Sequence, residues 1–259
     1  MQKMCEYTAY PVETKNNPIL SIIIPLYNEE RRLPKTFEAI ERLANMQEIL
    51  PFEVVFVDDG SRDGTAAFAR AFGARFPFAR LLTHSENRGK GAAVRTGMLA
   101  ARGHWRLFVD ADMATDLAEF QKFLPFLSAR APVIIGSRRI SGAEIQVHQP
   151  WLRETMGGVY TRLANFFTRA CVSDFTCGFK CFSAEAAEAI FSRSRIARWS
   201  YDAEILFLAH YLRFPIREVP VVWRNDGATR VRLWKDAPRS FFDLCLLRVY
   251  AALGYYGRR

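Results

Sequence analysis

Two acidic residues that are one position apart follow an apolar run near the middle of the chain. The run, Trp105 to Val109, predicts a buried strand, and Asp110-Ala111-Asp112 comes directly after it. If the chain stays extended there, the side chains of Asp110 and Asp112 point to the same side. Carboxylates in such a position can hold Mg²⁺ or Mn²⁺ together with phosphate oxygens. A capped turn can have the same sequence, so the pattern gains weight only from its surroundings.

A second acidic pair, Asp58-Asp59, follows another predicted strand at residues 53–57. Either carboxylate could accept hydrogen bonds from a base N–H or from ribose hydroxyls, whereas the alternative is an ordinary Asp-Gly turn. Ligands bind open α/β sheets at the carboxyl ends of the strands. Two neighbouring strands with acidic carboxyl ends therefore indicate a nucleotide crevice.

The segment Asn87-Arg88-Gly89-Lys90-Gly91 places two cations and two glycines just before a predicted helix. Close backbone approach and positive charge at a helix N-terminus suit a diphosphate. The chain has neither the Gly-x-x-x-x-Gly-Lys-Ser/Thr pattern of a P-loop nor a Gly-x-Gly-x-x-Gly after its first strand. The second absence argues against a dinucleotide-dependent oxidoreductase.

The elements that position these loops alternate between strand and helix over the first half of the chain. The apolar run at residues 20–26 is continuous, which is typical of a parallel strand that is buried on both faces. The alternation predicts an α/β fold with a Rossmann-like, doubly wound parallel sheet. The expected strands are 20–26, 53–57, 80–83, 105–109 and 132–136, and the expected helices are 33–49, 66–76, 91–101 and 119–130.

Beyond residue 140, apolar residues follow helical spacing in two segments. Residues 154–170 predict an amphipathic helix, and residues 237–253 predict a helix that is apolar nearly all round. We expect the second helix to be buried in a homodimer contact or against a membrane surface. The chain is therefore divided into a domain over residues 19–236 and a C-terminal apolar helix over residues 237–259. No apolar run approaches the roughly 18–20 residues that span a bilayer.

The charge of the chain is unevenly distributed. Residues 1–130 carry 17 Lys and Arg against 16 Asp and Glu, a net of +1, whereas residues 131–259 carry 19 against 11, a net of +8. We expect the basic half to face phosphates, acidic lipid headgroups or nucleic acid, the plain alternative being a solvated basic surface. Five cysteines, an odd number, and a start without a secretory signal favour a reduced, cytoplasmic setting.

In order and spacing, these motifs resemble those of the family 2 glycosyltransferases of the GT-A fold. The motifs of the first half are Pro25-Leu26-Tyr27-Asn28-Glu29, Asp58-Asp59-Gly60-Ser61, Asp63-Gly64-Thr65, Asn87-x-Gly89-Lys90-Gly91 and Asp110-Ala111-Asp112. Those of the second half are Gly136-Ser137-Arg138, Asp174-x-x-Cys177-Gly178-Phe179-Lys180-x-Phe182, Arg198-Trp199-x-x-Asp202-x-Glu204 and Glu218-Val219-Pro220-Val221-x-Trp223. The second set resembles the dolichyl-phosphate β-glucosyltransferase branch, with the dolichyl-phosphate mannosyltransferases as close relatives.

The resemblance implies an inverting, metal-dependent transfer of a hexose, expected to be glucose from UDP-glucose, to dolichyl or another polyprenyl phosphate. Four alternatives stay open: a mannosyltransferase that uses GDP-mannose, a family 2 enzyme with a soluble hydroxyl acceptor, a nucleotidyltransferase, and a basic module that binds membranes or nucleic acid. The expected partners are the nucleotide sugar, the lipid phosphate and a membrane surface, with no nucleic acid. The expected location is the cytoplasmic face of a membrane, bound peripherally. Residues 1–18 do not supply the N-terminal membrane helix of the eukaryotic glucosyl enzymes.

The resemblance also implies roles for individual residues. A donor pocket is implied for Pro25, Tyr27, Glu29, Asp58, Asp59, Lys90, Asp110 and Ala111, and metal ligation for Asp112 and Asp110. Catalytic roles are implied for Asp112, Arg138, Asp174 and Asp202, and acceptor binding for Arg138, Arg153 and Lys180. Glu204 is expected near sugar hydroxyls or the arginines, and Thr229 and Arg230 on a loop that closes over the diphosphate. For each residue of the second half, a structural ion pair is an equal alternative.

Overall fold

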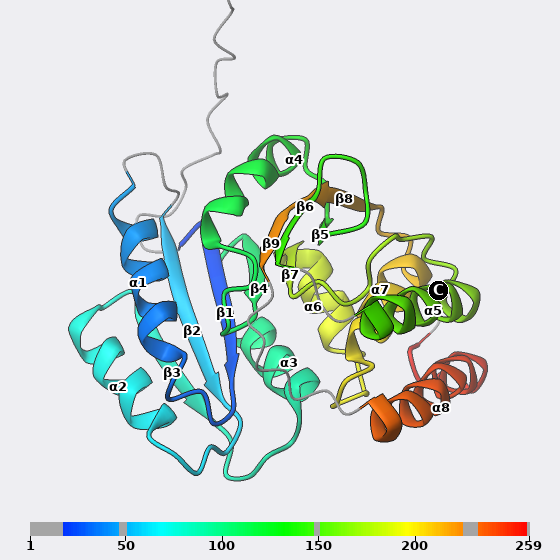
Figure 1. The fold of residues 1–259 in the computed structure, drawn as a ribbon, viewed down its shortest axis with the longest axis horizontal. Coiled ribbons are helices and arrows are strands. Elements are labelled where there is room, and N and C mark those ends of the chain that lie inside the picture. The colour runs from blue at the N-terminus through cyan, green and yellow to red at the C-terminus, as the bar shows by residue number, and fades with distance from the viewer. Residues whose placement is uncertain (1–17, 47–50, 148–150, 225–232, 258–259) are drawn as a thin grey trace, which may run out of the picture.

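A seven-stranded sheet forms the centre of the molecule, with helices on both of its faces (Figure 1). The computed structural model describes residues 18–46, 51–147, 151–224 and 233–257. The strand order is β3-β2-β1-β4-β7-β5-β8, and a separate ribbon pairs β6 with β9. The strands are β1 (Leu20–Leu26), β2 (Phe52–Asp58), β3 (Ala79–Thr83), β4 (Trp105–Val109), β5 (Val133–Ser137), β6 (Glu144–Val147), β7 (Phe179–Ser183), β8 (Ile216–Pro220) and β9 (Val222–Arg224). The helices are α1 (Leu33–Ala44), α2 (Thr65–Arg75), α3 (Lys90–Ala100), the 3₁₀ helix η1 (Leu117–Phe123), α4 (Leu124–Ser128), α5 (Trp151–Thr168), α6 (Ala184–Phe191), α7 (Tyr201–Tyr211) and α8 (Leu233–Ala252).

The first four strands confirm the parallel arrangement that the sequence predicts. β1 pairs in parallel with β2 and with β4, and β2 pairs in parallel with β3. Every residue of β1 is buried, which explains its continuous apolar run, because helices cover both faces. The carboxyl ends of β1, β2 and β4 therefore meet at one edge of the sheet, where the loops with the acidic motifs begin.

The other half of the sheet differs from the expected parallel order. β7 lies between β4 and β5 and runs antiparallel to both, whereas β5 pairs in parallel with β8. Because β7 runs in the opposite direction, its first residues lie at the edge where β4 and β5 end. The loop at residues 171–178 is thereby brought to the edge that carries the acidic motifs.

The expected helix at residues 119–130 is divided into η1 and α4. Asp116 caps η1 by accepting a hydrogen bond from the Ala118 N–H at 2.9 Å. Pro125 lies in the first turn of α4, where the missing N–H of proline is tolerated. A continuous helix would instead place this proline in its interior, which is costly.

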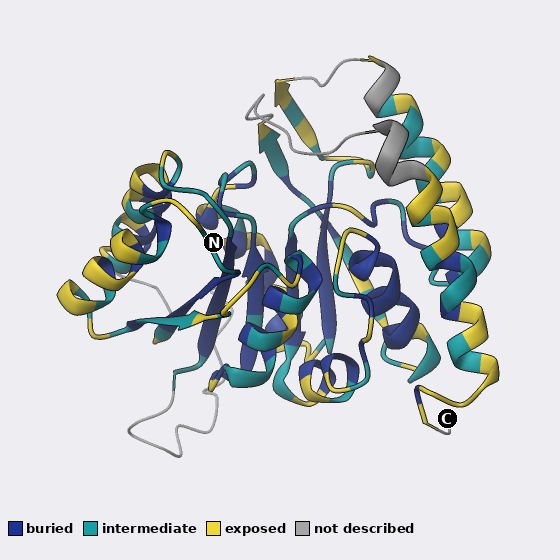
Figure 2. Cartoon of the chain, turned by 90° about the horizontal axis from the view of Figure 1, so that it is seen from below, coloured by how far each residue is buried: buried dark blue, intermediate teal, exposed yellow. Residues whose placement is uncertain are grey.

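Two apolar cores, one on each face of the sheet, hold the helices in place. One core includes residues of α1, α2, η1 and α4, and the other includes residues of α3 and α5 to α8. Leu244 and Leu247 of α8 are fully buried in the second core. α8 begins at Leu233, so the predicted boundary between residues 236 and 237 falls within one helix. The central strands of the large sheet are buried, and exposed residues gather on the outer sides of the helices (Figure 2). In the described ranges, no helix has the length and apolar character to cross a membrane.

Candidate active site

The loops after β1 and β2 are held against one another by hydrogen bonds. The Asn28 N–H donates to Ser61 Oγ at 2.8 Å, and the Asn28 side-chain oxygen accepts from the Arg62 N–H at 2.8 Å. The Glu29 N–H donates to Thr65 Oγ1 at 2.7 Å. The ends of the two strands and these loops form one wall of the site. This wall carries four residues of the predicted donor pocket, namely Pro25, Tyr27, Glu29 and Asp58.

Asp59 fixes the loop that leads into α3. Its carboxylate is buried and interacts with the His84 ring at 2.7 Å and with the Asn87 side chain at 3.0 Å. It also accepts from the backbone N–H groups of Arg88 at 2.9 Å and Gly89 at 2.7 Å. Both oxygens are engaged within the protein, so this geometry does not support the predicted direct contact of Asp59 with the donor. Asp59 positions the glycine-rich turn instead.

Lys90, the first residue of α3, reaches the end of β4. Its Nζ lies 2.6 Å from Asp110 Oδ1. Burial acts to lower the pKa of Lys90, but nearby carboxylates, that of Asp110 foremost, hold it above its ordinary value, so the ammonium stays charged. Gly178 packs directly on the Asp110 carboxylate, and a Cβ at this position would overlap it. The glycine is therefore required by steric contact with a site residue.

Asp112 lies in a turn beyond the end of β4. The strand ends at Val109 and Met113 has a φ of +50°, so the alternation of an extended strand does not set the direction of this side chain. Asp112 Oδ1 accepts from the Ala114 N–H at 3.0 Å. Burial and then the like charge of Asp110 raise the pKa of Asp112. A cation placed between the two carboxylates would relieve this repulsion.

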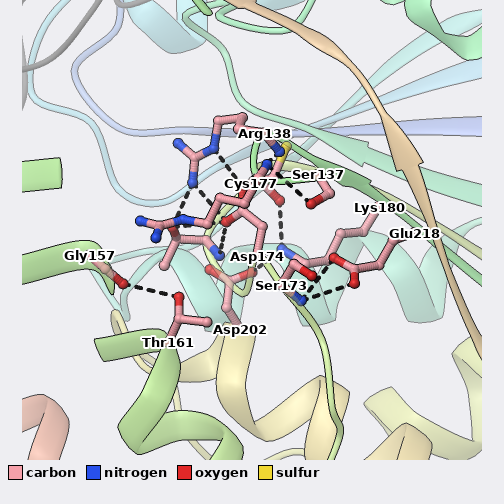
Figure 3. A network of polar contacts seen from close by, with 12 residues as sticks. Ser137, Arg138, Gly157, Thr161, Ser173, Asp174, Cys177, Lys180, Asp202 and Glu218 are labelled. Carbon is pink, nitrogen blue, oxygen red and sulfur yellow. Dashed lines mark hydrogen bonds and ion pairs between the residues drawn. The ribbon is translucent and has the colours of Figure 1, made fainter. Parts of the chain in front are cut away.

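Arg138, directly after β5, is paired with Asp174 in the loop before β7 (Figure 3). Its Nε and Nη2 donate to Asp174 Oδ2 and Oδ1 at 2.7 and 2.8 Å, and its backbone N–H donates to Oδ2 at 3.1 Å. Nη2 also donates to Thr176 Oγ1 at 2.7 Å, and the guanidinium carbon lies 5.2 Å from the centroid of the Trp223 ring. Burial acts to raise the pKa of Asp174, but Arg138 outweighs burial and lowers it to about 2. The structure thus brings the two predicted residues together as an ion pair.

Lys180 in β7 is paired with Asp202 at the start of α7. Its Nζ has no solvent exposure and donates to Asp202 Oδ1 and to the Cys177 carbonyl, both at 2.6 Å. A fully buried ammonium with these two partners does not reach a ligand at the surface, so the geometry does not support the predicted contact of Lys180 with the acceptor. Burial raises the pKa of Asp202, while Lys180 and then Lys90 act to lower it, and the net shift is upward.

Arg139 is a cation at this edge that the sequence analysis missed. Its side chain is exposed and lies over two glycines of α5. A Cβ on Gly157 would lie 2.8 Å from Nη2, and one on Gly158 would lie 3.4 Å from Nη1. A glycine inside a helix costs about 1 kcal/mol relative to alanine, and here the missing side chain of Gly157 leaves room for the guanidinium, whereas a Cβ on Gly158 would only touch it. The Gly-Gly pair within a helical pattern was the signal in the sequence.

Of the remaining predicted residues, only Glu204 has a described side chain. Glu204 accepts from the backbone N–H groups of Arg195 and Ile196, and not from sugar-site side chains or the arginines. Arg153 lies in α5, but its side chain is outside the described part of the structure. Thr229 and Arg230 lie outside the described residues.

Acidic strand ends, a charged lysine at a helix N-terminus and a pair of arginines are the kinds of groups that suit phosphorylated ligands at the edge of an α/β sheet. The family model described as Glycosyl transferase family 2 matches residues 21–191. The chain therefore belongs to glycosyl transferase family 2, and it is an enzyme that transfers a glycosyl group.

Individual relatives confirm the predicted resemblance to the dolichyl-phosphate β-glucosyltransferase branch. The chain is 33% identical over 247 residues to Dolichyl-phosphate beta-glucosyltransferase ALG5C of Trichomonas vaginalis, which covers 91% of this chain and 72% of that protein. It is 34% identical over 228 residues to the dolichyl-phosphate beta-glucosyltransferase of Homo sapiens, with 83% and 70% covered. A solved glucosyl-3-phosphoglycerate synthase of Mycobacterium tuberculosis, in complex with Mn²⁺, UDP-glucose and phosphoglyceric acid, is similar in fold. The TM-score is 0.63 at 19% identity, with 93% of this chain and 81% of that chain covered, which confirms the GT-A fold.

Proposed function

We propose that the protein transfers glucose from UDP-glucose to dolichyl phosphate or another polyprenyl phosphate, with inversion at the anomeric carbon. The main observation in support of this proposal is that an acidic pair and an arginine pair lie at the same edge of the sheet. Asp110 and Asp112 follow β4, and Arg138 and Arg139 follow β5, with β7 between the two strands. Burial acts to lower the pKa of Arg138, but the carboxylate of Asp174 and, more weakly, that of Asp110 raise it, so Arg138 and Asp110 interact electrostatically. The names of the relatives support glucose as the sugar and a lipid phosphate as the acceptor.

The donor is proposed to lie along the wall formed by the ends of β1 and β2. Pro25, Tyr27, Glu29 and Asp58 would surround the nucleoside. Lys90 and Asp110 would contact the diphosphate or the ribose, because they are the charged groups at the boundary between this wall and the arginine pair. A charged Lys90 at the N-terminus of α3 stabilises a diphosphate both by its ammonium and by the helix dipole.

Asp110 and Asp112 fit a divalent metal ion. They offer hard oxygen ligands, and a bound cation would relieve the repulsion by which Asp110, after burial, raises the pKa of Asp112. Within the described ranges no three His, Cys, Asp or Glu side chains gather as a metal cluster. Diphosphate oxygens and water would therefore complete the coordination. When bound, Mg²⁺ or Mn²⁺ would neutralise charge on the departing diphosphate.

The acceptor phosphate is proposed to bind at Arg138 and Arg139. A phosphate oxygen would attack the anomeric carbon as the bond from that carbon to the diphosphate oxygen breaks, so UDP leaves with the bonding electrons. The acceptor oxygen is already ionised near neutral pH, so the protein needs no strong general base. Catalysis would rest on positioning and on electrostatic stabilisation. Asp174 contributes by holding the Arg138 guanidinium in one orientation.

A lipid acceptor requires access to a membrane, and α5 and α8 offer a surface for it. The two helices lie side by side (Figure 1), with the rings of Phe167 and Phe241 5.9 Å apart. Their exposed apolar residues and those just after α8, here called the lipid-facing patch, are Trp151, Val159, Leu163, Phe166, Phe241, Phe242, Val249, Leu253 and Tyr255. Exposed arginines on the same helices are Arg162, Arg239 and Arg248, and Arg169 directly follows α5. Apolar and cationic side chains together favour peripheral binding to an anionic, cytoplasmic membrane face; a homodimer contact is the alternative occupant.

Transfer of labelled sugar to a polyprenyl phosphate tests the reaction. UDP-glucose and GDP-mannose are supplied in parallel, in detergent with Mg²⁺, and label is counted in the organic phase. We expect label from UDP-glucose. Label from GDP-mannose alone would keep the mechanism and replace the sugar. Nucleotide binding without organic-phase label from either donor would indicate a different donor or a soluble acceptor.

Sedimentation with anionic vesicles tests the lipid-facing patch. We expect the wild type to sediment with the vesicles and Phe242→Ser to do so less. The matched control is Phe68→Ser, because Phe68 is also exposed but lies on α2, outside the patch. Equal sedimentation of both variants with the wild type would remove the assignment.

A further inference from the structure

The segment after α8 returns to the protein core through one residue. Tyr256 is fully buried, although its neighbours Leu253 and Tyr255 are 66% and 50% exposed. Its ring lies 5.8 Å from that of Phe207 in α7, and its hydroxyl donates to Glu204 Oε1 at 2.7 Å. A buried tyrosine hydroxyl needs a hydrogen-bond partner, and here the partner is a carboxylate in α7.

Glu204 connects this C-terminal segment to the loop before α7. Its carboxylate is fully buried and accepts from the backbone N–H groups of Arg195 at 2.9 Å and Ile196 at 2.7 Å. Hydrogen bonds from backbone N–H groups and from a tyrosine are the compensation that a buried carboxylate requires. The position of residues 195–197 therefore depends on Glu204, and that of the Glu204 carboxylate depends in part on Tyr256.

Residues 195–197 in turn support the glycine-rich turn of the donor site. The Ala92 N–H donates to the Ala197 carbonyl at 3.1 Å. A Cβ on Gly91 would lie 2.6 Å from the Ile196 carbonyl oxygen, and a Cβ on Gly89 would overlap the Ala197 carbonyl. Gly89 also has a φ of +107°, which L side chains rarely adopt. The two glycines thus let the backbone of the turn lie directly on this loop.

Lys90 lies between these two glycines, and its ammonium is 2.6 Å from Asp110 Oδ1. The contacts form a continuous chain from Tyr256 through Glu204 and residues 195–197 to Lys90. Every link is a hydrogen bond, an ion pair or a close backbone contact between described residues. A shift of the loop would move the N-terminus of α3 and with it the ammonium.

We propose that Tyr256 and Glu204 are positioning residues for the donor site, and that they hold Lys90 in place through residues 195–197. The donor assignment rests on the proposed function. The C-terminal segment, which follows a helix of the lipid-facing patch, is then required for nucleotide binding although it does not touch the nucleotide. Removal of the Tyr256 hydroxyl weakens donor binding and leaves acceptor binding unchanged.

Tyr256→Phe tests the proposal, because it removes one hydroxyl and keeps the packing of the ring. We expect a KM for UDP-glucose that is about fivefold higher, an unchanged KM for polyprenyl phosphate, and a kcat at saturating donor within about twofold of the wild type. Glu204→Gln opposes backbone N–H groups with an amide and is expected to have the larger effect, about tenfold. The double variant is expected to lose less than the product of the two single effects, since the residues act as one unit.

Tyr255→Phe is the matched control, because it removes a hydroxyl from an exposed tyrosine in the same segment. All KM values are measured well below the melting temperature of each variant. A lower melting temperature with an unchanged donor KM would show that Tyr256 is only structural and would overturn the proposal. The dissociation constant of UDP, measured by calorimetry, gives the same test without transfer. A wild type that binds UDP but transfers no label to lipid would refute the proposed acceptor. The role of Tyr256 would then be decided by whether Tyr256→Phe raises the dissociation constant of UDP.

Discussion

The side of the site proposed for the donor and the side proposed for the acceptor differ in how their charges are compensated. On the donor side, Asp110 and Asp112 are like charges with Lys90 beside them, and the pKa of Asp112 is raised by burial and by Asp110. On the acceptor side, Arg138 has its own carboxylate in Asp174, whose pKa is lowered to about 2. On the proposed donor side, a further cation would therefore relieve the repulsion between Asp110 and Asp112, whereas the charges of the Arg138–Asp174 pair are matched within the protein.

The charges of the two sides therefore contribute differently to the free energy of folding. A like-charge pair costs stability in the folded protein and is useful only when a ligand compensates it. A buried ion pair with matched charges holds both side chains in one orientation. Removal of one partner leaves the other as an uncompensated buried charge, at a large cost in folding stability. Substitutions on the donor side should therefore reduce turnover with little loss of stability, whereas those in the Arg138–Asp174 pair should reduce both.

The largest effect is expected from Asp112→Asn. The amide keeps the shape of the side chain but removes a charged metal ligand, so kcat/KM should fall at least about a hundredfold. The free energy of unfolding should stay the same or rise, because the repulsion with Asp110 is lost. Transfer assays with and without Mg²⁺, together with urea unfolding, measure both. Asp116→Asn is the control, since Asp116 is an exposed cap of η1; wild-type turnover in Asp112→Asn would remove the metal assignment.

An intermediate effect is expected from the two arginines, and it separates binding from stability. Arg139→Ala should raise the KM for polyprenyl phosphate about tenfold with an unchanged melting temperature, because this side chain is exposed. Arg138→Ala should raise the same KM and also lower the free energy of unfolding by about 3 kcal/mol, because Asp174 is left buried and unpaired. Arg70→Ala, an exposed arginine on α2, should change neither value. If the acceptor KM is unchanged in both variants, the acceptor does not bind at this edge.

The smallest effect is a pH dependence of stability that arises from Asp174. Its pKa is lowered from 3.8 to about 2 in the folded protein, so its stabilising contribution is fully present above about pH 4 and is lost as the pH falls through 2. The contribution is about 2 kcal/mol near neutral pH. In urea unfolding, Asp174→Asn should be less stable than the wild type at pH 6, and the gap should narrow between pH 4 and pH 2. A gap that stays constant with pH would mean that the Asp174 charge does not produce it.

More of the proposed donor side than of the proposed acceptor side is predictable from the sequence. The parallel strands β1 to β4 and the acidic motifs after them were predictable, because a continuous apolar run marks a strand covered on both faces and the loop at its carboxyl end must lie at the sheet edge. The antiparallel β7 was missed, because a five-residue segment that contains a lysine and a serine carries no signal for its direction or its neighbours. Because β7 was not predicted, the ion pair between Asp174 and Arg138 was not predictable either.

The sequence also did not show which buried polar residues form their hydrogen bonds within the protein. The motifs named Asp59, Lys180 and Glu204, but only the packing of distant segments showed that each is engaged within the protein. Arg139 was overlooked because its position against Gly157 and Gly158 of α5 is a contact between segments that are far apart in the chain.

By itself, the sequence determined the family, the α/β class, the first four strands and the edge at which the acidic motifs lie. These properties follow from local hydrophobic patterning and from motifs that are contiguous in the chain. Only the tertiary structure decided which charges are paired, which lysine is buried, and how the last buried tyrosine connects to the donor site. Those properties depend on contacts between residues far apart in the chain, and burial and pairing, which set the energy of a charge, exist only once those contacts have formed.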